Sequence, residues 1–253
     1  MGVTWFVPLL FFGIAFLFSM LGMGGSQLYI PILYWAGLDL KTEAIPLGML
    51  LNVVNSTSAA VTYGRRRLIA WRTALPLAAV MLVLAPVGAW LNVRVSEALL
   101  LVLFALFTVV AAGLMLSGWR PARQHLAPGV ETGIRLAGGG VVGFLAGLIG
   151  RGGGSLVVPL LFMTGIDAKV AAATSAFVVS CAGVSSFASH VATTAQPQWW
   201  LWVASAGSVF MGSQLGSHVM ADRLKPRAMR YIFGGVLLAI AALLLIKDVL
   251  LAS

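Results

Sequence analysis

The chain has 253 residues, of which 60% are apolar and only 9% are charged. Soluble domains devote about a quarter of their residues to charged side chains, so this composition excludes a soluble globular fold and indicates a membrane protein. The formal net charge of +9 comes from basic clusters in short segments between apolar runs. Lysines and arginines at such places orient a membrane protein, and we therefore expect no nucleic-acid partner. The single cysteine, Cys181, excludes an internal disulfide.

Eight apolar segments follow one another along the chain. They are separated by charged or turn-forming clusters and cover residues 5–36, 45–63, 73–91, 98–116, 136–163, 170–191, 199–215 and 229–246. Six of them have about the length of a simple membrane-crossing helix, roughly 20 residues. The first and the fifth are longer, and glycines interrupt them at 22–25 and 150–154. Because glycine is unfavourable inside a helix, the sequence predicts an all-α polytopic membrane protein with two broken helices.

The two broken segments belong to an internal repeat. A constant shift of 128 residues superimposes them without gaps, and the matching positions include Gly22, Gly24, Gly25, Pro31 and Asp39 on Gly150, Gly152, Gly153, Pro159 and Asp167. Such self-similarity indicates two copies of one structural unit. We therefore divide the chain into a first repeat (1–117), a polar linker (118–134) and a second repeat (135–253).

The basic residues predict how the two repeats are oriented. If all eight segments crossed the bilayer, lysines and arginines would divide almost evenly between its two sides, eight against seven. If each broken segment instead turns at its glycines and leaves on the side where it entered, each repeat crosses three times and the second repeat is inverted. Twelve of the sixteen basic residues then lie on one face, three on the other, and Arg151 lies at membrane depth. The positive-inside rule favours this arrangement, with both termini outside the cytoplasm.

The fold class predicted is thus two inverted repeats, each with a glycine-broken re-entrant helix pair followed by three transmembrane helices. After each break a short helix begins, near Ser26 and near Ser155. The first N–H groups of a helix lack intrahelical partners and present partial positive charge, and glycines with positive φ can form a nest for an oxyanion. The alternative is that these glycines only permit close helix packing. Their recurrence at two symmetric breaks favours a midplane binding site of the kind that secondary transporters use.

The candidate substrate-binding residues lie in the breaks and in the helices that follow them. They are Gly24, Gly25, Ser26, Gln27, Asn52, Asn55, Arg151, Gly152, Gly153, Gly154, Ser155, Thr174 and Ser175. A buried arginine such as Arg151 is costly unless it meets an anion, a carboxylate or water, although it can also snorkel to an interface. The neutral polar residues can equally hydrogen-bond between helices.

Other polar residues receive structural interpretations. Asp39 and Asp167 each precede an apolar segment and fit helix N-caps better than proton carriers. His190 and His218 have no second histidine or acid at metal-ligand spacing. We therefore expect no metal and no cofactor.

The glycine motifs carry a family resemblance. Gly22-Met23-Gly24-Gly25 through Pro31, and the run 150–154 through Pro159, resemble the repeated G-x-G-G-G…P motif of the TauE/SafE sulfite exporter family. The resemblance covers the whole chain and includes the basic cluster 64–67, but Ser26 stands where the first copy would have its third glycine. It implies export of sulfite, sulfoacetate or other organosulfonates across the bacterial inner membrane.

The sequence therefore predicts a multi-pass transporter of small oxyanions that works by alternating access. The alternatives are an anion channel, which would need a continuous polar pore, and a transporter of another small organic anion. We find no nucleophile beside a base and no paired intramembrane carboxylates, so we do not expect an enzyme. There is no ATP-binding motif, and both uniport and proton antiport remain open. The expected partners are a small anionic substrate and the lipid bilayer, and a homo-oligomer is compatible with the sequence.

Overall fold

The computed structural model describes residues 6–92, 136–144, 154–191 and 197–244, together with 109, 112, 113, 116, 117 and 133. Within these residues every element is helical, which confirms the predicted all-α class. The elements are α1 (Val7–Leu21), α2 (Ser26–Trp35), the π-helical turn η1 (Leu40–Ala44), α3 (Ile45–Arg65), α4 (Trp71–Asn92), α7 (Gly154–Met163), α8 (Ala168–Val191), α9 (Trp199–Asp222) and α10 (Pro226–Leu244).

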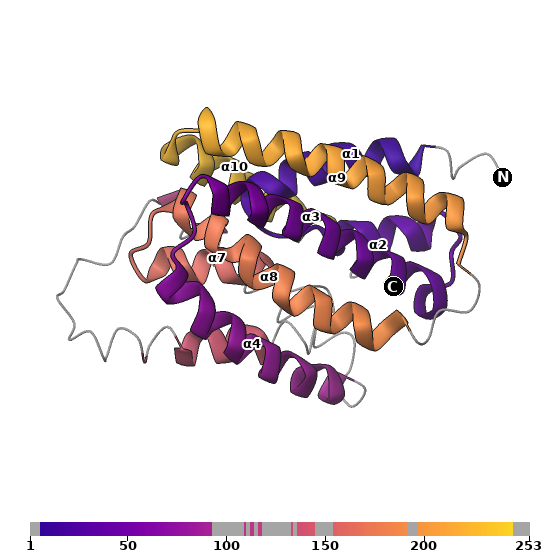
Figure 1. Cartoon of the computed structure of the whole chain (residues 1–253), viewed down its shortest axis with the longest axis horizontal. Coiled ribbons are helices and arrows are strands. Elements are labelled where there is room, and N and C mark those ends of the chain that lie inside the picture. Colours follow the sequence, from indigo (N-terminus) through magenta and orange to yellow (C-terminus); the bar gives the residue numbers. More distant parts are fainter. Residues whose placement is uncertain are drawn as a thin grey trace.

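The long helices lie side by side along the longest axis of the molecule (Figure 1). Helices α3 and α8 occupy the middle and pack against each other, with α9 also contacting α3 and α4 also contacting α8. Helix α1 packs mainly on α9, at one edge of the bundle, and α4 lies at the other edge. The seam between α3 and α8 therefore lies at the centre of a core to which α1, α2, α7 and α9 also contribute.

Two of the described helices are long and apolar enough to cross a bilayer. They are Thr42–Arg65 and Ala168–Ser185, and two further apolar helices, Val7–Leu21 and Trp71–Leu84, are shorter. Length and composition alone identify them, since the structure contains no lipid. The larger number of crossings expected from the sequence stays a prediction.

The predicted break in the first apolar segment is confirmed. Helix α1 ends at Leu21, and Gly22, Gly24 and Gly25 follow with φ of 69°, 87° and 119°. These values lie in the left-handed region that only glycine enters without strain. The N–H of Gly22 donates to the Ser19 carbonyl at 3.1 Å, which closes the end of α1.

Helix α2 runs back along α1 after the break. The first turns of α1 and the last turn of α2 line one apolar cavity, which includes Phe6, Leu9, Trp35 and Ala36. The start of α1 and the end of α2 therefore lie at the same end of the molecule. A Cβ on Gly138 would lie 2.7 Å from Leu160 of α7, so residues 136–144 approach the second half of that helix.

Small residues allow the closest helix contacts. A Cβ on Gly212 or Gly216 of α9 would lie 2.3 or 2.1 Å from the carbonyl oxygens of Phe12 and Phe16 in α1. This G-x-x-x-G spacing is the one that membrane helices use for close backbone approach. Residues 136–144 pack on α4 in a similar way, because a Cβ on Gly139 would lie 2.0 Å from Leu77.

The two predicted aspartate caps are confirmed. The Asp39 carboxylate accepts hydrogen bonds from the N–H and the hydroxyl of Thr42 at 2.9 and 2.8 Å, and Asp167 accepts one from the Lys169 N–H at 3.0 Å. Such caps satisfy N–H groups that the first turn of a helix leaves unpaired.

Helix α9 is longer than the sequence predicts. The apolar segment was expected to end at residue 215, but the helix continues to Asp222 because Gly216, Ser217 and Met220 are buried against its neighbours. These seven further residues, about two helical turns, bring the end of α9 to the ends of α3 and α8.

Candidate functional site

The first glycine break lies buried between α3 and α8. Residues 21–27 are all buried, and the break contacts α3 through Asn52 and Asn55 and α8 through Ala172 and Ser175. Asn55 is the eleventh of the 21 residues of α3, so the break reaches the middle of a helix long enough to span a bilayer. Backbone that leaves helical geometry at such depth must be covered by protein or water, and here protein covers it.

Three of the predicted site residues hold the backbone of the break. The Nδ2 group of Asn55 donates to the Gly24 carbonyl, and the Ser175 hydroxyl donates to the Gly22 carbonyl at 2.8 Å. The Oδ1 atom of Asn52 accepts a long hydrogen bond, 3.4 Å, from the N–H of Ser26. Polar residues from α3 and α8 therefore fix the conformation of this break.

Several buried polar atoms around the same break have no partner in the described part of the chain. They include the Tyr29 hydroxyl and Asn55 Oδ1, and the N–H groups of Gly24 and Gly25 likewise have no acceptor there. The Tyr29 ring lies against Gly25, where an added Cβ would be 2.9 Å from the hydroxyl oxygen. Buried polar groups without a hydrogen-bond partner destabilise the folded protein, and a ligand that binds to them is one explanation for their presence.

The chemistry of these atoms suits a small oxyanion. Two backbone N–H groups and a phenol hydroxyl can donate hydrogen bonds, and the N-terminus of α2 adds partial positive charge. The Asn55 Oδ1 atom can only accept, so it would take a proton-bearing oxygen of the ligand or a water molecule.

Tyr29 is the residue that sequence reasoning missed. One tyrosine in an apolar helix resembles any core aromatic residue, and its ring packs as one, edge to face with Phe11 at a centroid distance of 5.0 Å. Only the structure reveals that its hydroxyl is buried without a partner among the described residues.

The remaining predicted residues divide into four groups. Ser26 and Gln27 begin α2 and are buried at the break. Thr174 accepts a hydrogen bond from the Ala70 N–H at 3.1 Å, ahead of α4, and does not join the break. Gly154 begins α7, next to the helix start predicted near Ser155. The predictions for Arg151, Gly152 and Gly153, and for the side chain of Ser155, lie outside the described residues.

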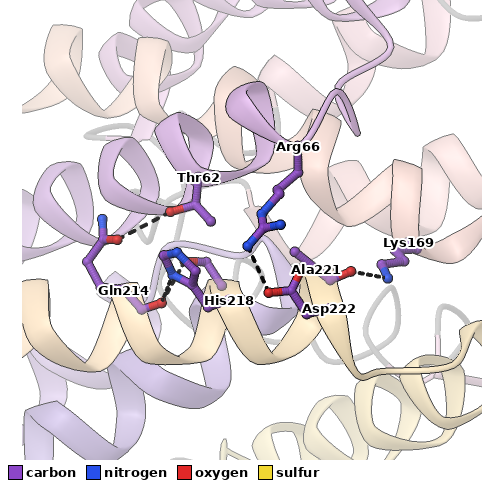
Figure 2. A network of polar contacts seen from close by, with 8 residues as sticks. Thr62, Arg66, Lys169, Gln214, His218, Ala221 and Asp222 are labelled. Carbon is purple, nitrogen blue, oxygen red and sulfur yellow. Dashed lines mark hydrogen bonds and ion pairs between the residues drawn. The ribbon is translucent and has the colours of Figure 1, made fainter.

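A polar network joins the ends of α3, α8 and α9 (Figure 2). Arg66 donates to the Asp222 carboxylate at 2.9 Å, and the Lys169 ammonium donates to the Ala221 carbonyl at 2.5 Å. His218 Nδ1 lies 2.7 Å from the Gln214 carbonyl and must carry the hydrogen, because a carbonyl only accepts. Basic residues that are distant in sequence thus lie at one end of the molecule, which we call the basic end.

Comparison with known proteins agrees with a membrane protein. The chain is 26% identical over 235 residues to a "probable membrane transporter protein" of Xylella fastidiosa, covering 90% of this chain and 89% of the relative. It is 25% identical over 228 residues to the "probable membrane transporter protein YunE" of Bacillus subtilis, covering 79% and 82%. A relative of the same description from Methanocaldococcus jannaschii is 26% identical over 191 residues, 71% of this chain and 69% of that protein.

These relatives place the chain in the class of membrane transporter proteins. The family description "Sulfite exporter TauE/SafE" matches residues 7–244. The chain therefore belongs to the TauE/SafE sulfite exporter family, as the glycine motifs predicted. A transporter family agrees with the expectation that the chain is not an enzyme. No solved structure was found to match it.

Proposed function

We infer that the protein exports small oxyanions, such as sulfite, sulfoacetate or other organosulfonates, across the bacterial inner membrane by alternating access. The observation that carries this proposal is a group of donors at the first break that have no acceptor in the described part of the chain, the N–H groups of Gly24 and Gly25 and the hydroxyl of Tyr29. They lie beside the midpoint of α3, where a transporter places its substrate. The family supplies the substrate class as an expectation.

Contacts at the basic end support an inverted arrangement of the repeats. If every apolar segment crossed the bilayer, Arg66 would lie on the opposite side from Lys169 and Arg223. Instead Arg66 is 2.9 Å from Asp222, the neighbour of Arg223, and Lys169 contacts Ala221. These distances favour repeats 1–117 and 135–253 related by inversion, with 118–134 as the linker and the basic end in the cytoplasm.

The second break completes the proposed site. Helix α7 packs on α8 as α2 packs on α3, so the second glycine run would approach the centre from the other side. Arg151 would then add a guanidinium, whose planar fork suits an oxyanion, while Met23 occupies the equivalent position in the first repeat.

Transport by the purified protein tests the proposal. Proteoliposomes should exchange sulfite or sulfoacetate with saturable counterflow, and sulfate and taurine would define selectivity. A flux that neither saturates nor shows counterflow would identify a channel. The absence of flux for all four compounds would contradict the proposed function.

Two tyrosine variants test the site itself. Tyr29→Phe removes an unpartnered hydroxyl, so it should leave the protein as stable or up to about 2 kcal/mol more stable while weakening sulfite binding about tenfold. The control Tyr63→Phe removes a hydroxyl that donates to the Ser19 carbonyl at 2.6 Å. It should destabilise the protein and leave affinity unchanged. Calorimetry and thermal unfolding in detergent provide both readouts, and equal affinities for the two variants would exclude Tyr29 from the site.

A further inference from the structure

A second candidate site lies at the basic end, between the ends of α3 and α9. A cavity of about 220 Å³ opens there. Its lining residues are Val61, Thr62, Arg65, Arg66, Gln214 and His218, four of which appear in Figure 2. The volume is below the roughly 300–1,000 Å³ of sites that hold drug-sized ligands, so the cavity suits a small ion with its water.

The charge of this cavity is positive. Arg66 is paired with Asp222, and both side chains are nearly half exposed, 48% and 44%. Arg65 has no acidic partner in the described part of the chain, so its charge remains available to a ligand. Guanidinium groups match the geometry of oxyanions and bind them through paired hydrogen bonds.

A line of polar contacts leads from the cavity toward the first break. Thr62 contacts Gln214 at 3.4 Å, and the Gln214 amide donates to the Ser58 hydroxyl at 2.8 Å. One position earlier on α9, the Ser213 hydroxyl donates to the Asn55 carbonyl at 2.8 Å. Asn55 in turn donates to Gly24 of the break.

The spacing of these residues places them on one helix face. Asn55, Ser58, Thr62 and Arg65 follow one another on α3 at intervals of three, four and three residues, which is the periodicity of a single face. Ten residues of helix correspond to about 15 Å. This row of four polar residues, which we call the track, therefore joins the basic end to the middle of α3.

We propose that the cavity between α3 and α9 is an entry site for small oxyanions, from which the substrate passes along the α3–α9 seam to the first break. The inference rests on the proposed function, because it assigns the first contact of the same substrate. Arg65 is the ligand that captures the anion, Arg66 and His218 form the rim, and the hydroxyls of Thr62 and Ser58 replace water along the track.

The test compares Arg65→Gln with the matched control Arg72→Gln. Arg72 is an exposed arginine near the start of α4 and does not line the cavity. Initial rates of radiolabelled sulfite uptake into inverted membrane vesicles report transport from the basic end. Arg65→Gln should raise KM about tenfold with little change in maximal rate, and Arg65→Lys should recover part of the loss. Arg72→Gln should match the parent protein.

Ionic strength and lipid composition sharpen the test. The difference in KM between Arg65→Gln and the parent should shrink as salt rises, because screening weakens the capture of an ion at an exposed site. An anionic lipid headgroup would present similar chemistry, so binding of sulfite is also measured by calorimetry in phosphatidylcholine nanodiscs. If phosphatidylglycerol abolishes sulfite binding to the parent but not to Arg65→Gln, lipid occupies the cavity and the proposal is overturned.

The two proposals fail in different ways. Equal KM values for Arg65→Gln and Arg72→Gln, with normal transport by both, would overturn the entry site and leave the proposed function intact. The absence of transport by the parent protein would reject the proposed function. If Arg65→Gln then binds sulfite as tightly as the parent protein does, the entry site is rejected as well.

Discussion

Alanine substitutions at two glycines with similar backbone conformations can distinguish two causes of destabilisation. One is backbone strain, and the other is the crowding of an added methyl group in the break. Gly24 and Gly37 have φ of 87° and 93°. A Cβ on Gly24 would lie 2.1 Å from Asn52 Oδ1, whereas a Cβ on Gly37 would meet nothing within 4 Å. Both alanine variants should lose about 1–2 kcal/mol to the left-handed conformation.

Gly24→Ala should be less stable than Gly37→Ala by a further 1–3 kcal/mol, roughly the cost of overpacking a tight site. It should also displace Asn52 and so reduce transport, while Gly37→Ala transports normally. Thermal unfolding and sulfite flux on the same preparations provide the comparison. Equal melting temperatures would mean that the break relaxes around the added methyl group.

The sequence was informative about the residues of the first break and less so about their roles. The glycine pattern predicted where α1 ends and α2 begins, because only glycine favours the left-handed region. Asn52, Asn55 and Ser175 were selected as polar groups in the helices after the breaks, and the structure brings them to the break. That they hold its backbone could not be predicted, since contacts over more than a hundred residues depend on how α3 packs against α8.

At the scale of the helices, the α1–α9 contact depends on the absence of side chains at two positions. A methyl group on Gly216 would lie 2.1 Å from the Phe16 carbonyl oxygen, which is backbone and cannot move aside independently. Gly207, on the same helix, has nothing within 4 Å of its Cβ position. The two positions therefore form a matched pair.

Gly216→Ala should destabilise the protein by about 1–3 kcal/mol through overpacking. Gly207→Ala should be neutral or slightly stabilising, because alanine is the better helix former by up to about 1 kcal/mol. Thermal unfolding in detergent compares the two. A Gly216→Ala protein as stable as Gly207→Ala would show that α1 and α9 can separate without penalty.

The end of α9 shows why a hydropathy pattern can place the end of a helix too early. Polar residues such as Ser213, Gln214 and His218 look like the margin of an apolar segment. They lie on a continuing helix, where Ser213 and Gln214 have partners on α3 and His218 contacts the Gln214 carbonyl one turn earlier. The cavity between α3 and α9 was therefore invisible in the sequence, which offered its arginines only as orientation signals.

At the scale of the whole molecule, three surface positions distinguish inverted repeats from parallel ones. Arg67 follows α3, Arg223 follows α9, and Gln198 precedes α9; all three are exposed. Inverted repeats place Arg67 and Arg223 in the cytoplasm and Gln198 outside. If all eight apolar segments crossed, Arg67 and Gln198 would share one side and Arg223 would lie on the other.

Single cysteines at these positions, in a Cys181→Ser background, should reveal the arrangement. On intact cells a membrane-impermeant maleimide should label Gln198→Cys and spare Arg67→Cys and Arg223→Cys, which should react only after the membrane is permeabilised. The expectation follows from the positive-inside rule and from the ion pair at 2.9 Å between Arg66 and Asp222, which two groups on opposite faces of a bilayer could not form. Labelling of Arg67→Cys together with Gln198→Cys would contradict the inversion, and with it the placement of the entry cavity on the cytoplasmic side.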